Sequence, residues 1–225
     1  MGKVLEMMRL RFSASAIAAL ALLAACGSVE RDQEGVVSQL RAVSRVLAQN
    51  GAAAAPAPEL GRAELAAFNV PVIVVNSSSG VAYLVPMNRS SGGGEFWATG
   101  SQQTMVLRGG QISMTRGFGA FDVIESVVPQ DMRAAVGKNY TRSYTTLDGA
   151  DHPVRHAMTC DSRLAGAETI TIKGRSHATQ RIHETCVSGR ETYENDYWLD
   201  ASGVRKLHQF MGDAIGYVTV SRVID

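Results

Sequence analysis

Residues 193–212 read YENDYWLDASGVRKLHQFMG and carry the clearest strand pattern in the chain. Successive side chains of a β-strand point to opposite faces, so one face carries Tyr193, Asn195, Tyr197 and Leu199, and the other carries Glu194, Asp196 and Trp198. A mostly aromatic face opposite a charged face is typical of a half-buried antiparallel strand. The DASG sequence at 200–203 predicts a hairpin turn, because an aspartate can bond the backbone two residues on and a glycine tolerates positive φ.

Strands and turns of the same kind fill the rest of the C-terminal half. The turn sequences DGAD, LAGAE, KGRS, SGR, DASG and MGDAIG separate predicted strands at 140–147, 153–161, 168–172, 179–187, 190–199, 204–211 and 217–223. On this prediction, Cys160 and Cys186 lie at the ends of two strands that have one further strand between them.

The segment from residue 70 onward begins this pattern. We predict strands at 70–75, 81–88, 95–99, 104–108 and 111–117, and the RGGQ sequence at 108–111 predicts a two-glycine hairpin turn. Residues 121–128 fit a short strand or a helical turn, and residues 131–137 fit a loop or one helical turn. Because the strands are short and no amphipathic helices separate them, we predict a mainly β fold. It would be a single antiparallel domain over 70–225, built as a curved sheet, a sandwich or a partly open barrel.

The N-terminus has the pattern of a secreted lipoprotein. An apolar run over 14–25 follows basic residues; it is too short for a membrane span of about 20 residues and fits a signal peptide. The LAAC sequence at 23–26 resembles the bacterial signal in which the cysteine receives lipid, so we predict removal of residues 1–25 and lipidation at Cys26. An ordinary signal peptide with a chance cysteine is the alternative. By resemblance to the sorting rules of such lipoproteins, the lack of an aspartate after the cysteine favours anchoring in the outer membrane, facing the periplasm.

Residues 26–69 are predicted to tether the anchor to the β domain. Apolar residues recur at spacings of four, three and four over 36–47, which predicts one N-terminal amphipathic helix. The GAAAAPAPELG sequence at 51–61 is typical of a small-residue and proline linker.

The net charge argues against nucleic-acid binding, and the number of cysteines bears on whether the chain forms a disulfide. The 225-residue chain has a formal net charge of +1, so no basic excess indicates nucleic-acid binding. Two cysteines, Cys160 and Cys186, remain after Cys26, and an even pair in an oxidising compartment favours a disulfide. Such a crosslink would contribute roughly 3–4 kcal/mol to stability. Two reduced, buried cysteines or a metal-binding pair are the alternatives.

Two segments resemble the YjbF/GfcB family of lipoproteins. The first, ENDYWLDASGVRKLHQFMG at 194–212, is similar to a family motif with an asparagine–any–tyrosine–tryptophan strand, an aspartate-glycine turn and a strand ending in glycine. The second, FWATGSQQTMVLRGGQISMTRGFGAFDVIES at 96–126, is similar to the family's tryptophan strand, glycine hairpin and glycine-rich corner. Phe118 stands where leucine is commoner in the family. The resemblance implies an outer-membrane lipoprotein of capsule or exopolysaccharide secretion, with an outer-membrane β-barrel as a partner, and it implies no molecular activity.

The sequence offers few candidates for catalysis or metal binding. It contains neither a G-x-S-x-G nucleophile motif nor an H-E-x-x-H zinc motif. Glycosidases need two carboxylates across a cleft, and the candidates by proximity are Glu191, Glu194, Asp196 and Asp200. The histidine candidates for a metal are His183, in an H-x-x-C sequence with Cys186, and the pair His152 and His156, but zinc sites usually show tighter pairs. We therefore expect no catalytic residue, no metal and no cofactor.

The prediction that follows is a non-catalytic protein that binds or scaffolds the exopolysaccharide export machinery. A sugar-stacking surface could use the rings of Trp97, Tyr193, Tyr197 and Trp198, with Tyr217, although core packing is the commoner fate of such rings. One alternative is a periplasmic enzyme that trims or modifies the polysaccharide, which requires a cleft with acids of raised pKa. Another is a lipid-binding curved sheet, which requires an apolar pocket of several hundred Å³.

Overall fold

The computed structural model describes residues 59–89 and 93–225, and these are mostly β-sheet. The predicted lipidation site and the predicted helix at 36–47 lie outside these ranges. Twelve strands form one sheet, and each neighbouring pair in it is antiparallel, which confirms the predicted fold class. None of the described helices is long and apolar enough to span a membrane.

The first half of the described chain supplies six strands and two short helices. Their bounds are α3 Arg62–Ala66, β1 Val72–Ser77, β2 Gly80–Arg89, β3 Glu95–Ala98, β4 Thr104–Arg108, β5 Gln111–Arg116, β6 Val123–Val127 and α4 Met132–Ala135. Strand β6 settles the ambiguous segment at 121–128 as a strand, and α4 is the helical turn expected within 131–137. Asp131 caps α4, because its carboxylate accepts a hydrogen bond from the backbone nitrogen of Arg133 at 2.9 Å.

The second half of the described chain supplies six further strands. Their bounds are β7 Asn139–Leu147, β8 Pro153–Ile172, β9 Arg175–Ser188, β10 Glu191–Asp200, β11 Gly203–Phe210 and β12 Tyr217–Ile224. One of them, β10, contains the alternating segment 193–199. In β10, Tyr197 and Leu199 pack into one hydrophobic cluster and Trp198 into another, as the alternation requires.

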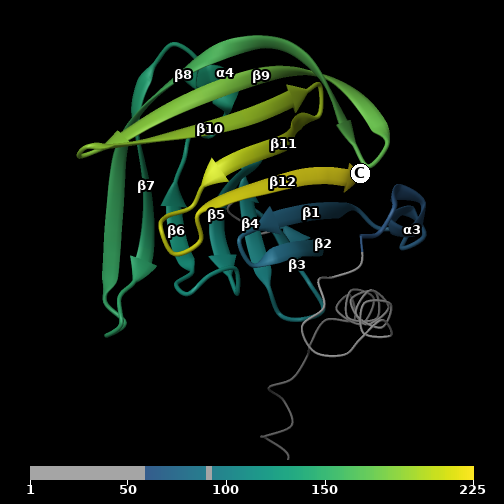
Figure 1. Cartoon of the computed structure of the whole chain (residues 1–225), viewed down its shortest axis with the longest axis horizontal. Helices are drawn as coiled ribbons and strands as arrows, with labels where there is room; N and C mark the ends of the chain where they lie inside the picture. The colour runs from purple at the N-terminus through teal and green to yellow at the C-terminus, as the bar shows by residue number, and fades with distance from the viewer. Residues whose placement is uncertain (1–58, 90–92) are drawn as a thin grey trace, which may run out of the picture. The chain divides into compact units, whose positions relative to one another are not determined.

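The strands follow a meander around a curved sheet. The order from one edge to the other is β5-β4-β3-β2-β1-β12-β11-β10-β9-β8-β7-β6, so β1 and β12 pair where the two ends of the described chain meet. Figure 1 shows the sheet curling until the edge strands β5 and β6 lie next to each other. The described sheet is therefore a nearly closed barrel.

Side chains complete the seam between the two edge strands. An edge strand leaves backbone groups without strand partners, and the amide of Gln209 in β11 supplies partners to β5. Its Oε1 accepts from the backbone nitrogen of Ile112 at 3.1 Å, and its Nε2 donates to the backbone oxygen of Ile112 at 3.2 Å. The hydroxyl of Thr115 accepts from the backbone nitrogen of Val123 in β6 at 3.0 Å. The Thr115 bond thus joins the two edge strands directly, and Gln209 ties the edge of β5 to β11 across the barrel interior.

One predicted turn is wrong, and the error changes the place of the two cysteines. The LAGAE sequence does not end a strand, because β8 continues through it as a bulge at Leu164–Gly166, where Gly166 has φ of 118°. A bulge bends a strand and increases its twist without ending its pairing. Strands β8 and β9 are therefore direct neighbours, and Cys160 lies opposite Cys186 instead of one strand away. The two residues form the predicted disulfide, with their Cα atoms 4.0 Å apart.

The inner face of the sheet encloses the main hydrophobic core. Its most buried members come from several strands and from the β5–β6 connection, and they include Ile73, Leu84, Met105, Ile112, Phe118, Tyr197 and Leu207. Side chains of this size fill the interior of a small barrel.

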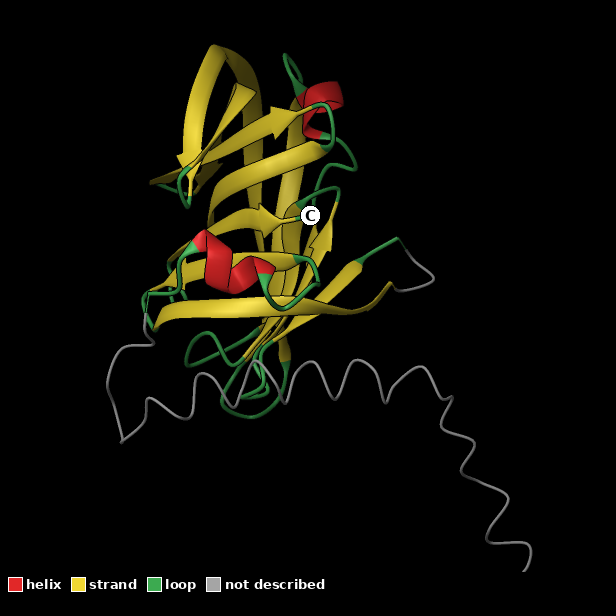
Figure 2. Ribbon diagram, turned by 90° about the vertical axis from the view of Figure 1, so that its right-hand side faces the viewer, coloured by secondary structure: helices red, strands yellow, loops and turns green. Residues whose placement is uncertain are grey.

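A second hydrophobic core lies on the outer face. Beyond the bulge, the β8–β9 hairpin arches over its neighbours, and its Ile170 and Ile172 pack with Trp198 and Val223. Helix α3 adds Leu65 to the same cluster, and Figure 2 shows this helix against the outer side of the strands. The bulge at Gly166 thus allows one hairpin to take part in the sheet and also to cover it.

The β4–β5 turn confirms the predicted two-glycine hairpin. Gly109 and Gly110 have φ of 55° and 76°, a region that side chains disfavour. A Cβ on Gly109 would lie 2.3 Å from the backbone oxygen of Gln130, and one on Gly110 would lie 2.6 Å from the side chain of Val204. Only glycine allows this turn to pack so closely against the α4 loop and β11.

Candidate functional site

A buried charge pair links strands across the inside of the barrel. Arg142 in β7 and Glu184 in β9 are 3.0 Å apart, with 3% and 0% of their side chains exposed. Glu184 also accepts hydrogen bonds from Tyr140, from Asn195 at 2.6 Å and from Tyr197 at 3.1 Å. Both carboxylate oxygens are therefore engaged. We call these five residues the inner cluster.

Burial and close partners shift the pKa values of Arg142 and Tyr197 in the inner cluster. Burial alone would lower the pKa of Arg142, but its interactions with Tyr197 and Glu184 outweigh that effect, and the net shift is upward. Burial raises the pKa of Tyr197 well above its usual value, so this hydroxyl stays neutral and can donate. Arg142 also bonds the Oε1 of Gln111 at the start of β5. The cluster thus ties β5, β7, β9 and β10 together.

A pocket of about 340 Å³ lies at the end of the barrel that carries the β7–β8 and β11–β12 turns. Its lining includes the aromatic rings of Phe121, Tyr144 and His156 and the carboxylates of Asp148 and Asp213. We call it the aromatic pocket. Its volume falls at the lower end of the range of about 300–1,000 Å³ typical of small-molecule sites.

Ring contacts give the aromatic pocket a rigid wall. Tyr144 and His156 face each other across β7 and β8 and stack with their ring centroids 4.8 Å apart. The ring of Tyr144 also lies edge-on to Phe210, at 6.4 Å. Gly212 packs flat against Tyr144, because a Cβ there would lie 2.8 Å from the ring. Phe121 is 47% exposed, so part of its ring is open to a ligand.

The carboxylates of the pocket differ from those of a catalytic pair. Asp148 accepts hydrogen bonds from the backbone nitrogens of Ala150 at 2.8 Å and His152 at 2.9 Å, which hold its turn in place. These bonds lower the pKa of Asp148, whereas a general acid needs a raised one. Asp213 is exposed in the β11–β12 turn. The arrangement offers rings and hydrogen-bond acceptors rather than an acid poised to protonate.

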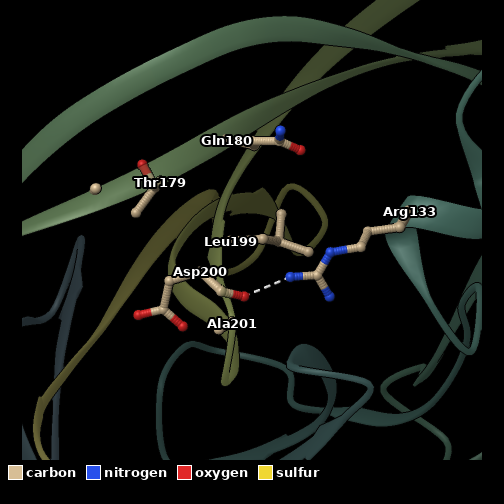
Figure 3. Close-up of a pocket in the computed structure, with 7 residues that line it drawn as sticks. Arg133, Thr179, Gln180, Leu199, Asp200 and Ala201 are labelled. Carbon is tan, nitrogen blue, oxygen red and sulfur yellow. Dashed lines mark hydrogen bonds between the residues drawn. The ribbon is translucent and has the colours of Figure 1, made fainter.

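A second pocket, of about 380 Å³, is lined by residues of α4, β9 and the β10–β11 turn. Figure 3 shows the guanidinium of Arg133 reaching to the backbone oxygen of Asp200, and the two atoms are 2.5 Å apart. The carboxylate of Asp200 instead binds Arg205 at 2.8 Å. Of these two contacts, only the one between Arg133 and the backbone of Asp200 lies within the pocket lining.

Comparison with known proteins places the chain in a family. Residues 39–223 match the family described as group 4 capsule polysaccharide lipoprotein GfcB, YjbF. The chain belongs to this family.

Among solved structures, this YjbF-family chain is similar to the crystal structure of the hypothetical lipoprotein YmcC from Escherichia coli K12. The two are 19% identical with a TM-score of 0.63, and the match covers 74% of this chain and 89% of the other. At that identity the likeness shows the fold alone. No curated protein matches the chain. Family membership makes the chain a capsule-associated lipoprotein and confirms the resemblance found in its sequence.

The YjbF-type motif residues hold the barrel together rather than line one surface. Asn195 and Tyr197 belong to the inner cluster, and Trp97 lies in the inner core. Trp198 lies in the outer core, with Lys206 4.7 Å from its ring centre, and Tyr193 stacks on Phe210 at 3.9 Å. The structure therefore does not bring the four candidate sugar-stacking residues together. Sugar binding by any of them stays a prediction.

The candidate carboxylates do not form a pair across a cleft, although two of them, Glu194 and Asp196, lie near the same histidine. Glu191 bonds the hydroxyl of Tyr193, and Asp200 binds Arg205. Asp196 lies on the outer face, where it binds Arg181 at 2.8 Å and His183 at 2.9 Å, and Glu194 lies 4.0 Å from the same histidine. These acids do not face one another across either pocket.

The metal candidates have other roles among the described residues. Cys160, Glu184 and Cys186 lie close enough to bind a cation together, but the disulfide removes both thiolates. His183 lies on the opposite strand face from Cys186, and His152 pairs with Asp148 at 3.4 Å.

Sequence reasoning missed the aromatic pocket. Its residues come from four separate segments, and only the pairing of β7 with β8 places Tyr144 beside His156. Two local signals fall in the pocket: the DGAD turn, which contains Asp148 and indicates only a turn, and His156, which sequence reasoning offers only as a metal ligand. An exposed Phe121 has no pattern of its own, so the fold is needed to find it.

Proposed function

We propose that this YjbF-family chain is a non-catalytic, lipid-anchored component of capsule or exopolysaccharide production that binds the polymer in the aromatic pocket. Lipid on Cys26 would anchor it in the outer membrane with the barrel facing the periplasm. In that position it could also dock onto an outer-membrane β-barrel of the export machinery. The family description supports the link to lipoproteins and to capsule polysaccharide.

The observation that carries the binding role is the exposed aromatic surface of the pocket. Rings offer large apolar area at low entropic cost to the flat faces of sugars. Phe121 is half exposed, and His156 has one face against Tyr144 and is otherwise exposed. The carboxylates of Asp148 and Asp213 lie in the same lining and can accept hydrogen bonds from hydroxyl groups. This combination fits binding of a polar ring compound.

The state of the acids favours binding over cleavage. Glycosidases place a raised-pKa acid and a second carboxylate on opposite sides of the bond that is cut. In the aromatic pocket the pKa of Asp148 is lowered by the backbone bonds of its own turn. Moving that carboxylate toward a substrate would leave two backbone donors unpaired, which opposes a catalytic role.

The test is recovery of the lipidated full chain from its own cell envelope. Mass spectrometry should find a diacylated or triacylated Cys26 as the first residue, and polysaccharide or an export protein should be recovered with the chain. A Cys26→Ser variant is the matched control, and it should leave the membrane fraction. An intact leader, or recovery of the chain with release of small sugars from added polymer, would contradict the proposal.

A further inference from the structure

We propose that the aromatic pocket selects sugars by charge, taking amine-bearing units best, neutral units less well and uronic acids least. This inference rests on the proposed function and names the class of ligand for the same site. It is carried by the charges of the pocket together with its stacked rings.

The charges around the pocket are predominantly negative. Its lining includes Asp148 and Asp213 and contains no lysine or arginine. The hydroxyl of Tyr144, in the pocket wall, is affected by these charges. Burial raises the pKa of Tyr144, and the charges of Asp213 and Glu191 raise it further. A negative potential at a partly enclosed site attracts cations and repels anions.

The nearby cationic groups do not offset this potential. Arg155 lies next to His156 in β8, but alternation turns it to the other face, where it donates to Ser143 at 3.1 Å. The two histidines of this region, His152 at 3.4 Å from Asp148 and His156 in the lining, carry a charge only when protonated.

Each part of the pocket has a separate task in this arrangement. Phe121 and the His156–Tyr144 stack provide the platform for the sugar ring, and a cation near an aromatic face gains further attraction. Asp213 is exposed and free of the turn bonds that occupy Asp148, so its carboxylate can accept a charge-assisted hydrogen bond from a protonated amine. Stacking thus sets affinity for any sugar, and Asp213 sets the preference for charge.

Calorimetric titration of the full chain in detergent would measure this preference. The probes are glucosamine, glucose and galacturonate oligomers of equal length, at low salt and near-neutral pH, because acidification favours positively charged histidines in the site. We expect at least about tenfold tighter binding of the glucosamine oligomer than of the galacturonate oligomer, since each 1.4 kcal/mol is tenfold.

Three variants separate the two tasks. Phe121→Ala should weaken binding of all the oligomers that bind, by about tenfold, while Asp213→Asn should reduce glucosamine binding to the level of glucose. Phe96→Ala is the matched control, because Phe96 is 36% exposed and lies outside the pocket lining; it should bind as the unaltered chain does. Circular dichroism checks that each variant is folded.

The outcomes distinguish this inference from the proposed function. Failure of all three oligomers to bind, preference for galacturonate, or equal weakening by Phe96→Ala would overturn the charge-selective site. If the unaltered chain is recovered with polymer from the envelope and Phe121→Ala is recovered equally well, the pocket is wrong and the capsule role stands. If the unaltered chain is recovered with neither polymer nor export protein, the proposed function itself fails.

Discussion

Two charged clusters made of similar side chains lie on opposite faces of β9 and β10. The inner cluster pairs Arg142 with Glu184, and an outer cluster pairs Arg181 with Asp196 and His183. The inner pair exposes 3% and 0% of its side chains, and the outer Arg181–Asp196 pair exposes 37% and 16%. His183 and Glu184 are adjacent in sequence, so strand alternation alone sends them to these two environments.

The difference shows how burial changes what an ion pair does. Taking charges out of water costs several kcal/mol per ion, and only close partners and full hydrogen bonding offset it. Glu184 has that full set of partners, so its cluster specifies which strands meet inside the barrel. The outer cluster remains near water, which weakens the attraction of its charges, and it contributes little specificity.

Breaking the inner cluster should have the largest effect on stability. Glu184→Gln keeps the size of the side chain but leaves Arg142 as a buried charge without its counter-ion, and we expect a loss of about 3–5 kcal/mol. Urea unfolding of the full chain measures it. The double variant Glu184→Leu with Arg142→Met should recover only part of this loss, because it removes the unpaired charge but leaves Tyr140, Asn195 and Tyr197 without their buried acceptor. A loss under about 1 kcal/mol for Glu184→Gln would mean that burial does not distinguish the two clusters.

Removing the disulfide tests whether the inner cluster depends on the crosslink beside it. Cys186 lies two residues from Glu184, and its bridge to Cys160 spans 26 residues. Replacing both cysteines by alanine should cost about 3.5 kcal/mol through the greater freedom of the unfolded chain. If the crosslink also positions Glu184, the cost of Glu184→Gln should fall in this background; additive losses would show that the two act independently.

The comparison also shows which parts of the structure the sequence could provide. The alternation at 193–199 placed Tyr197 on one face of the strand and Asp196 and Trp198 on the other, because period-two patterning is a local property. The two-glycine turn at 108–111 was predictable for the same reason. The disulfide followed from the cysteine count and the expected compartment, although the number of strands between the cysteines did not.

The remaining features depend on contacts between distant segments. Gly166 looked like part of a turn, and only pairing with β9 makes it a bulge within one long strand. Gln209 satisfies Ile112 from the far side of the barrel, 97 residues away in sequence. Phe121, Tyr144 and Asp213 meet only after the meander has brought two turns to the same end of the barrel. None of these contacts has a local pattern.

Titration of the outer cluster should have a moderate effect with a definite sign. Burial alone would raise the pKa of Asp196, but the hydrogen bonds from Arg181 and His183 outweigh it and lower that pKa in the folded chain. A carboxylate of this kind stabilises the fold above its unfolded pKa of about 3.9, and the contribution is lost as pH falls through the lower folded value.

Asp196→Asn should therefore cost about 1 kcal/mol at pH 7, a value reduced for the exposure of Arg181. The two proteins should become similar in stability once the pH falls below the lowered folded pKa of Asp196. Urea unfolding from pH 7 downward measures the difference. Glu194→Gln is the control, since Glu194 is 67% exposed, and it should change stability by less than about 0.5 kcal/mol. An Asp196→Asn deficit that does not shrink as the pH falls would assign the effect to packing.

Added salt should change the stability cost of breaking the outer cluster but not that of breaking the inner cluster, and this is the smallest effect that we expect. The Debye length falls from about 10 Å at 0.1 M to about 3 Å at 1 M salt, so partly exposed charges are screened and buried ones are much less affected. Added sodium chloride should therefore reduce the cost of Asp196→Asn by a few tenths of a kcal/mol. The cost of Glu184→Gln should not change, because no ions reach a pair with 3% and 0% exposure. Equal salt dependence of both variants, measured by urea unfolding, would show that water penetrates the barrel interior. The inner cluster would then resemble the outer one in its effective dielectric environment.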